Sequence, residues 1–503
     1  MEQIIKTLQD EIKQRWTGAR PVYPWPWVHP AHVRVLLYAE GVLFDSGSQG
    51  FHGLKHVIAT LRSSPWYWVK FDVTTVNRGP DPTAMQQNMT LDQLSLNANF
   101  DQVWLFGVSE GNLLSAAEQN AIADFMKQGG GVLATGDHAS LGQGIAGAVP
   151  RAGQMRKYPA PPNTPPDYNS TLVKGYDGIY DFYDQSDDQP QSIRLRHYRL
   201  WDLFPRPFSR RWAPHPILCG VDGPITILPD HQHEGEAIIP SSFPAAEWPS
   251  KGGFQPRPEV IAWGLIKDPS ATTHLGQEIG VVAAYDGHRA DIGRVAADST
   301  WHHFFDINLL GDPTLDPVND NGFVATTAGQ KALKHIENYY LNLAVWLATP
   351  AKQIAMRDAM WWGVIWTNKY WEMAATIDRV PIFWLGEQAR DVFGRVATQC
   401  NRREWLFWEV LDPAIRLNLE KLLAEGAILP DTIEVFVLGS VLKKLIQHYG
   451  YSNERRSPGT PPRAAGVEKL LREATREGLE AMRTHQEEVL GNSKLLLQGV
   501  KRE

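Results

Sequence analysis

The sequence predicts an α/β protein with a parallel sheet, followed by an all-helical domain at the carboxyl end. Short apolar segments alternate with helical patterns before about residue 325, which is typical of parallel strands joined by right-handed helical crossovers. Beyond that point helical periods dominate and tryptophans are frequent, which indicates a packed helical core. We expect a helical arm over 1–30, an α/β domain over 31–325, a helical domain over 326–452, and a linker with a terminal helix over 453–503.

Each element of the α/β domain has its own sequence signal. The clearest helix begins with a capping box of Ser115 and Glu118 and ends at the glycines 129–131. A segment rich in Pro, Tyr, Arg and Asp, about 150–230, is expected to be an insertion that covers the carboxyl edge of the sheet. In chain order we expect strand 33–38, helix 54–61, strands 67–76 and 103–106, the helix after Ser115, and strands 132–134, 259–266, 279–285 and 293–298.

The composition excludes several classes of protein. The net charge of −7 argues against a general nucleic-acid-binding surface. Two cysteines, Cys219 and Cys400, exclude a disulfide framework and a Cys-rich zinc site, and they are typical of a reducing compartment. No run reaches the roughly 18–20 apolar residues of a membrane span, and Met1–Trp16 has a short amphipathic pattern rather than that of a signal peptide. We expect a cytoplasmic protein with a small-molecule ligand, no nucleic-acid or membrane partner, and homo-oligomer formation through the carboxyl-terminal helices as one option.

The segment Leu133–Ala139 carries the strongest functional signal. An apolar strand runs into Gly136, and Asp137 and His138 follow it. In open α/β sheets, ligands bind at the carboxyl ends of the strands. An imidazole suits proton transfer at neutral pH, and a carboxylate can fix its tautomer. Asp137 and His138 are therefore candidate catalytic residues or metal ligands, with helix capping as the alternative role of Asp137.

The densest polar cluster is the segment Asp230–Glu234. In an extended segment His231 and His233 point to the same side. Two imidazoles and a carboxylate such as that of Glu234 suit a divalent metal (Zn, Fe or Mn). The helical HExxH spacing of zinc proteases is absent, so a solvated polar loop is the alternative.

Further acids and imidazoles follow the later apolar runs, and a sheet could gather them with Asp137 into one pocket. His302, after the last strand, is a candidate general base, or an electrophile that stabilises a developing oxyanion. Asp298 would orient an imidazole or cap a helix. The candidate substrate contacts are His52, Asp286, His288 and His303.

Several motifs together resemble a known family. In chain order they are Gln128-Gly129-Gly130-Gly131-Val132 before the Gly136-Asp137-His138 turn, His215-Pro216-Ile217 with Gly220 and Asp230 downstream, Val260-Ile261-Ala262-Trp263, and Gly293-Arg294-Val295 before His302. They resemble the ThuA-like (trehalose-utilisation) family, which is similar in fold to the class I glutamine amidotransferases. The resemblance covers about 33–310 and implies a flavodoxin-like or amidotransferase-like parallel sheet, His302 in the place of a catalytic histidine, and a link to sugar metabolism.

One departure from the amidotransferase pattern bears on the chemistry. A glutamine amidotransferase carries a Cys nucleophile at its sharp strand-to-helix turn, whereas here the turn holds Gly136, Asp137 and His138. Cys-dependent glutaminase activity is therefore not expected. Two classes of function stay open: a hydrolase-like enzyme for a polar, carbohydrate-related small molecule, with or without a metal, and a non-catalytic ligand-sensing or scaffold protein.

Overall fold

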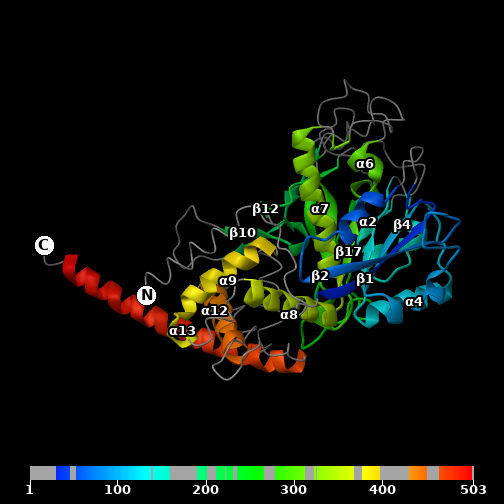
Figure 1. The fold of residues 1–503 in the computed structure, drawn as a ribbon. Helices are drawn as coiled ribbons and strands as arrows, with labels where there is room; N and C mark the ends of the chain where they lie inside the picture. Colours follow the sequence, from blue (N-terminus) through cyan, green and yellow to red (C-terminus); the bar gives the residue numbers. More distant parts are fainter. Residues whose placement is uncertain are drawn as a thin grey trace.

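A computed structural model gives the arrangement of the chain (Figure 1). The residues that it describes are 30–45, 53–137, 140–158, 190–200, 211–220, 223–229, 235–265, 278–311, 322–324, 326–367, 376–396, 430–449 and 464–500. The expected alternation of strands and helices is confirmed within these ranges, and so is the helical character of the carboxyl-terminal part.

A central sheet organises the α/β part. Its strands, in spatial order, are β3 (Gln86–Gln87), β2 (Val69–Asn77), β1 (Ala31–Glu40), β4 (Gln102–Gly107), β5 (Gly131–Ala134), β17 (Val295–Asp298), β16 (Glu278–Tyr285), β15 (Glu259–Leu265) and β8 (Arg194–Leu195). Strands β3 to β17 are parallel, whereas β16, β15 and β8 each run antiparallel to the strand before them in this order. We call the edge where the parallel strands end the carboxyl edge, and the opposite one the amino edge.

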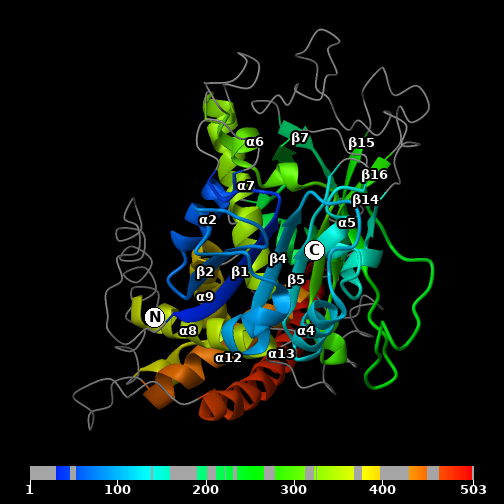
Figure 2. The same cartoon turned by 90° about the vertical axis from the view of Figure 1, so that its right-hand side faces the viewer.

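Helices cover both faces of the sheet (Figures 1 and 2). On β1, Val33, Val35 and Leu37 belong to one buried cluster, which also contains side chains of α2 (Lys55–Arg62) and α7 (Thr327–Leu347). Alternate residues of the same strand, such as Leu36, face a second cluster with α4 (Ala116–Lys127). The strict alternation follows from the two-residue period of a strand, and it makes the sheet the middle of three layers.

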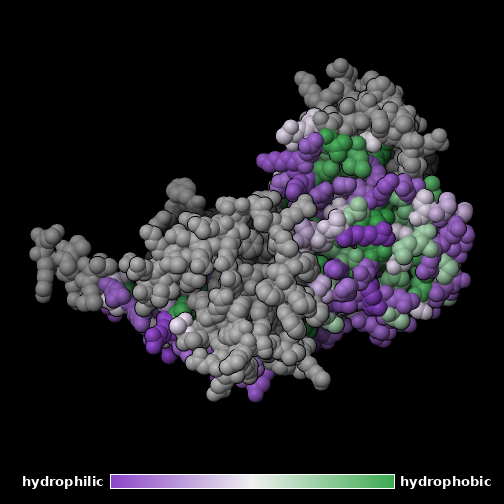
Figure 3. Space-filling model, viewed as in Figure 1, coloured by the Kyte–Doolittle hydropathy of each residue, from purple (hydrophilic) through white to green (hydrophobic). Residues whose placement is uncertain are grey.

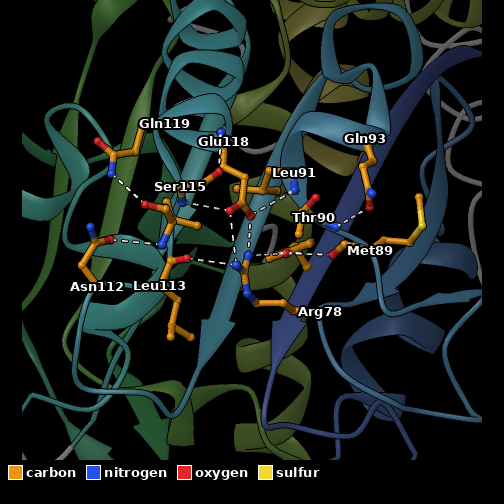
Figure 4. A network of polar contacts seen from close by, with 12 residues as sticks. Arg78, Met89, Thr90, Leu91, Gln93, Asn112, Leu113, Ser115, Glu118 and Gln119 are labelled. Carbon is orange, nitrogen blue, oxygen red and sulfur yellow. Dashed lines mark hydrogen bonds and ion pairs between the residues drawn. The ribbon is translucent and has the colours of Figure 1, made fainter.

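A polar network anchors α4 near the carboxyl end of β2 (Figure 4). The expected capping box is present: Ser115 Oγ accepts from the backbone N of Glu118, and the Glu118 carboxylate accepts from the backbone N of Ser115. The same carboxylate, which is buried, forms an ion pair with the partly exposed Arg78; this pair lowers the pKa of Glu118, although burial alone would raise it. Burial raises the pKa of the neighbouring Tyr38 to about 12. Because one carboxylate caps the helix and pairs with Arg78, the start of α4 is fixed to the sheet.

The helical part begins with a helix that packs directly on the sheet. Gln102 Nε2 donates to the carbonyl of Ala344 in α7 over 2.7 Å. A Cβ at Gly131 would lie 2.0 Å from the carbonyl oxygen of Leu347, so only glycine allows the start of β5 to approach this helix so closely. The helices that follow are α8 (Pro350–Thr367), α9 (Ile382–Val396), α12 (Pro430–Tyr449) and α13 (Ala464–Val500). One buried cluster extends from β1 to α13, so both parts of the described chain share a core.

The remaining elements are short. The short strands are β6 (Arg156–Lys157), β7 (Pro190–Ser192), β9 (His197–Leu200), β10 (Arg211–Pro214), β11 (Cys219–Gly220), β12 (Gly223–Pro224), β13 (Ile227–Pro229) and β14 (Glu236–Ala237). The short helices are α3 (Leu96–Asn99), α5 (Gln143–Ala146) and α6 (Asp306–Leu310), with 3₁₀ turns η2 (Leu91–Leu94), η3 (Ala152–Gln154), η4 (Pro216–Leu218), η5 (Gly287–Ala290), η6 (Trp301–His303) and η8 (Ile377–Arg379). Strand β8 lies within the expected insertion, and it extends the central sheet beyond β15.

Hydrophilic side chains dominate the visible described surface, with separate apolar patches among them (Figure 3). Among the described helices, none combines the length and the apolar composition that a membrane span requires.

Candidate functional site

The structure brings Asp137 and His302 together at the carboxyl edge. Asp137 follows β5 by three residues, and His302 lies in the turn η6 after β17, the strand next to β5. Nε2 of His302 lies 3.1 Å from Oδ2 of Asp137. The two side chains are 4% and 1% exposed. An acid and an imidazole that are 165 positions apart in the chain thus form one buried pair.

Two further side chains fix the geometry of this pair. Thr300 Oγ1 donates to Oδ1 of Asp137 over 2.9 Å and accepts from the backbone N of His302. On the other side of the ring, Nδ1 of His302 lies 2.8 Å from Oδ1 of Asn308. Both ring nitrogens of His302 therefore contact protein groups, and the plane of the ring is set from both ends.

The protonation of the pair depends on how the Asn308 amide is turned. If its oxygen faces Nδ1, that nitrogen donates to it, and a further proton lies between Nε2 and the Asp137 carboxylate. If its nitrogen faces Nδ1, the ring is neutral and donates to Asp137 alone. With either orientation of the amide, one proton lies between His302 and Asp137, which is an arrangement that acid–base catalysis uses.

A buried arginine lies behind the pair. Arg156, in the short strand β6, donates from Nη2 to the backbone carbonyls of Asp137 and Ser299, over 2.8 and 2.6 Å. A Cβ at Gly136 would lie 2.6 Å from the guanidinium carbon, so a glycine before Asp137 makes room for it. Burial lowers the pKa of Arg156, but a guanidinium stays protonated in proteins. Its charge therefore lies beside the buried carboxylate, and its hydrogen bonds join the segments that follow β5 and β17.

A second acid–imidazole pair lies next to the first, under α7. Asp298, the last residue of β17, accepts from Tyr339 Oη over 2.7 Å, and its other oxygen lies 2.8 Å from Nδ1 of His303. The neighbouring Tyr340 Oη donates to the backbone carbonyl of His303. Of the two roles expected for Asp298, the structure shows that it orients an imidazole, that of His303. His303 itself, a predicted substrate contact, is fully buried among these groups, which fits a packing role.

The expected single pocket does not include Asp286 and His288. Strand β16 runs antiparallel to β17, so its end lies at the amino edge, opposite to Asp137 and His302. There Arg294 Nε donates to Oδ1 of Asp286 over 2.9 Å, and Arg294 Nη1 donates to the carbonyl of Trp346. Arg294 lowers the pKa of Asp286, whereas burial alone would raise it. Burial also holds the pKa of His288 well below its usual range.

The other predicted site residues lie outside the described part of the chain. They are His52, His138, His231, His233 and Glu234. Within the described residues, no group of three or more His, Cys, Asp or Glu side chains is arranged to hold a metal ion. The metal prediction therefore stays a prediction.

Sequence reasoning missed three residues of the site, namely Thr300, Asn308 and Arg156. Thr300 had a usable signal, because a threonine just before a short turn is a typical cap, and its side chain does accept from the backbone N of His302. Asn308 and Arg156 had none, since their roles depend on how separate segments meet. A further acid missed at this edge is Glu40, whose carboxylate accepts from the backbone N of Val108 and joins the ends of β1 and β4.

Comparison with known proteins adds little to this geometry. No family model and no curated protein matches the chain. One similar solved structure is described as a ThuA-like protein from Parabacteroides merdae. It is 13% identical over 64% of this chain and 92% of its own, with a TM-score of 0.27. At that level the likeness carries no information on the chemistry of this chain, and the fold class rests on the strand order described above.

Proposed function

We propose that this protein is a hydrolase-like enzyme that acts on a polar small molecule at the carboxyl edge of the sheet. The observation that supports it best is the 3.1 Å contact between His302 Nε2 and Asp137 Oδ2, which pairs two proton-transfer groups where open α/β sheets bind ligands. Helix capping does not account for this contact, because the Asp137 carboxylate faces side chains that follow another strand.

In this proposal Asp137 and His302 act as one unit. Both ring nitrogens of His302 and both carboxylate oxygens of Asp137 have protein partners, so we assign to the pair the storage of a proton for transfer to or from substrate or water. His138, the next residue in the chain, is proposed as a second imidazole for the same step. In hydrolysis, water adds to the electrophilic centre and gives a proton to the unit, which then returns it to the leaving group.

The proposed substrate is a polar compound related to carbohydrates. The motif resemblance in the sequence supports this class, and it does so by analogy only. His231, His233 and Glu234 are proposed to hold a divalent metal (Zn, Fe or Mn), which when bound lowers the pKa of a water molecule. Metal analysis of the purified protein and of the His231→Ala/His233→Ala variant tests this part separately.

The main experiment is a turnover screen on a panel of 4-nitrophenyl glycosides, 4-nitrophenyl esters and sugar lactones. The wild type is expected to hydrolyse at least one class of compound, and Asp137→Asn and His302→Gln are expected to lose that activity. His288→Gln at the amino edge is the matched control and should keep it. Thermal stabilisation by a sugar without turnover of any panel member would contradict the enzyme proposal and indicate ligand sensing.

A further inference from the structure

A continuous path of hydrogen bonds joins helix α7 to the candidate pair. Tyr339 Oη donates to Asp298 Oδ2 over 2.7 Å, and the other carboxylate oxygen accepts from the backbone N of Thr300 over 3.2 Å. Thr300 Oγ1 then donates to Asp137. We propose that Tyr339 is a positioning residue for the Asp137–His302 pair, and that it acts through Asp298 and Thr300. Its effect on catalysis rests on the proposed function, whereas its effect on the geometry of the pair does not.

The residues along this path are shielded from water. Asp298 and Thr300 are fully buried, and the side chain of Asp137 is almost so. In such surroundings each hydrogen bond is stronger than in water, and a broken one is not replaced by a water molecule. Removal of one member should therefore change the orientation of its neighbours.

Thr300 is the point where the path reaches both members of the pair. Its hydroxyl has one proton, which it donates to Asp137, and the same oxygen accepts from the backbone N of His302. Its backbone N is bound to Asp298, so a shift of that carboxylate moves the residue that holds the pair.

The two adjacent tyrosines of α7 explain why the path begins there. Tyr339 holds the carboxylate of Asp298, and Tyr340 holds the backbone carbonyl of His303 in the turn η6. Their ring centroids are 5.9 and 5.5 Å from that of Phe304, which follows in the chain. Helix α7 thus holds the turn that carries His302 in place. This helix lies after residue 325, where we expected the α/β domain to end.

Other polar and charged groups also contact the residues of this path, and they determine how Asp298 can move. His303 Nδ1 shares Asp298 Oδ1 with the backbone N of Thr300. Arg156 faces the segment from the other side, with its guanidinium on the carbonyls of Ser299 and Asp137. When Tyr339 loses its hydroxyl, Asp298 keeps His303 and Thr300 as its hydrogen-bond partners. We therefore expect the carboxylate to move toward these two, and Thr300 to move with it.

The test uses NMR of the full-length protein labelled with ¹⁵N-histidine. The readout is the set of ring N–H resonances of His302, assigned by their loss in His302→Gln. The variants are Tyr339→Phe, Thr300→Val, which removes the hydroxyl, and Thr300→Ser, which keeps it. The matched control is Tyr67→Phe, because Tyr67 is also buried and its hydroxyl donates to a backbone carbonyl, that of Met360, away from the path.

We expect Tyr339→Phe and Thr300→Val to shift the His302 resonances, and we expect Thr300→Ser and Tyr67→Phe to leave them at the wild-type positions. The inference is overturned if Thr300→Val shifts them and Tyr339→Phe does not, if Tyr67→Phe shifts them as much as Tyr339→Phe, or if no variant shifts them. Should Tyr339→Phe not fold, an unshifted spectrum of Thr300→Val still overturns it.

A turnover measurement separates this inference from the proposed function. If the wild type hydrolyses a panel compound, Tyr339→Phe should lower kcat severalfold at unchanged KM, with kcat calculated per folded protein so that a smaller folded fraction does not count as a loss of catalysis. If Tyr339→Phe shifts the His302 resonances while the wild type hydrolyses nothing, the positioning role stands and the proposed function fails.

Discussion

The two edges of the sheet carry the same residue types in different arrangements. At the carboxyl edge, the acid Asp137 contacts an imidazole, and the arginine Arg156 binds the backbone carbonyls of Asp137 and Ser299. At the amino edge, the acid Asp286 contacts the arginine Arg294, which also binds α7 through the carbonyl of Trp346. An acid next to an imidazole can exchange a proton near neutral pH, whereas an acid next to an arginine stays ionised. The first arrangement suits chemistry, and the second suits the attachment of a helix.

The largest expected difference between the edges is in turnover. Asp137→Asn should lower kcat on a hydrolysed panel compound by about 10²- to 10⁴-fold, the usual contribution of a general acid–base group. Asp286→Asn should leave kcat unchanged, because its carboxylate lies at the opposite edge. Equal losses of kcat in the two variants would show that the two edges do not differ in their contribution to turnover.

The next difference is in stability. Arg294→Met should lower the free energy of unfolding by up to about 3–5 kcal/mol, because it leaves Asp286 without this arginine and the carbonyl of Trp346 with only the longer contact of Gln353 Nε2, at 3.3 Å. The control is Arg194→Met at the exposed pair with Glu278, where the side chains are 54% and 44% exposed and about 0–1 kcal/mol is expected. Urea unfolding measures both values. A loss at Arg294 as small as that at Arg194 would show that the amino-edge pair is not structural.

The smallest expected effect is the pH dependence of stability at the amino edge. Burial, and the nearby charge of Arg294, lower the pKa of His215 to about 3. The ring of His215 packs edge-on against Trp346, with 5.0 Å between the ring centroids. Below its unfolded pKa of about 6.5 only the unfolded chain takes up this proton, so stability is full above that pH and falls toward pH 3.

This pH dependence should disappear in His215→Asn. Asparagine keeps an acceptor for the backbone N of Ile217, which His215 Nδ1 now binds, but it does not titrate. Between pH 7 and pH 5 the wild type should lose about 1–2 kcal/mol more than this variant in urea unfolding. Parallel pH profiles of wild type and His215→Asn would show that His215 is protonated in the folded protein.

Much of the fold could be predicted because its signals are local. The apolar run around Val35 and the capping box of Ser115 each depend on a few neighbouring residues, and both appear in the structure. The position of the amino-edge cluster could not be predicted in this way. The direction of β16 depends on its partner strands, and an antiparallel strand carries the acid and imidazole that follow it to the other edge.

The candidate site was predictable to a similar extent. Asp137 and His302 follow apolar strands, and that position identified them, together with the family resemblance in the case of His302. The side chains that hold them come from other segments, such as Tyr339 in a helix that the periodicity assigned to a separate domain. No sequence pattern within one segment records such a contact, so tertiary packing alone reveals it.

The central claim is that Asp137 and His302 work as one unit, and a double-mutant cycle on turnover tests it most directly. The kcat of the wild type, Asp137→Asn, His302→Gln and the double variant would be measured on a panel compound that the wild type hydrolyses. The account predicts that each single change causes a large loss and that the double variant is no slower than the slower single variant. Losses that multiply in the double variant, or single variants as fast as the wild type, would contradict it.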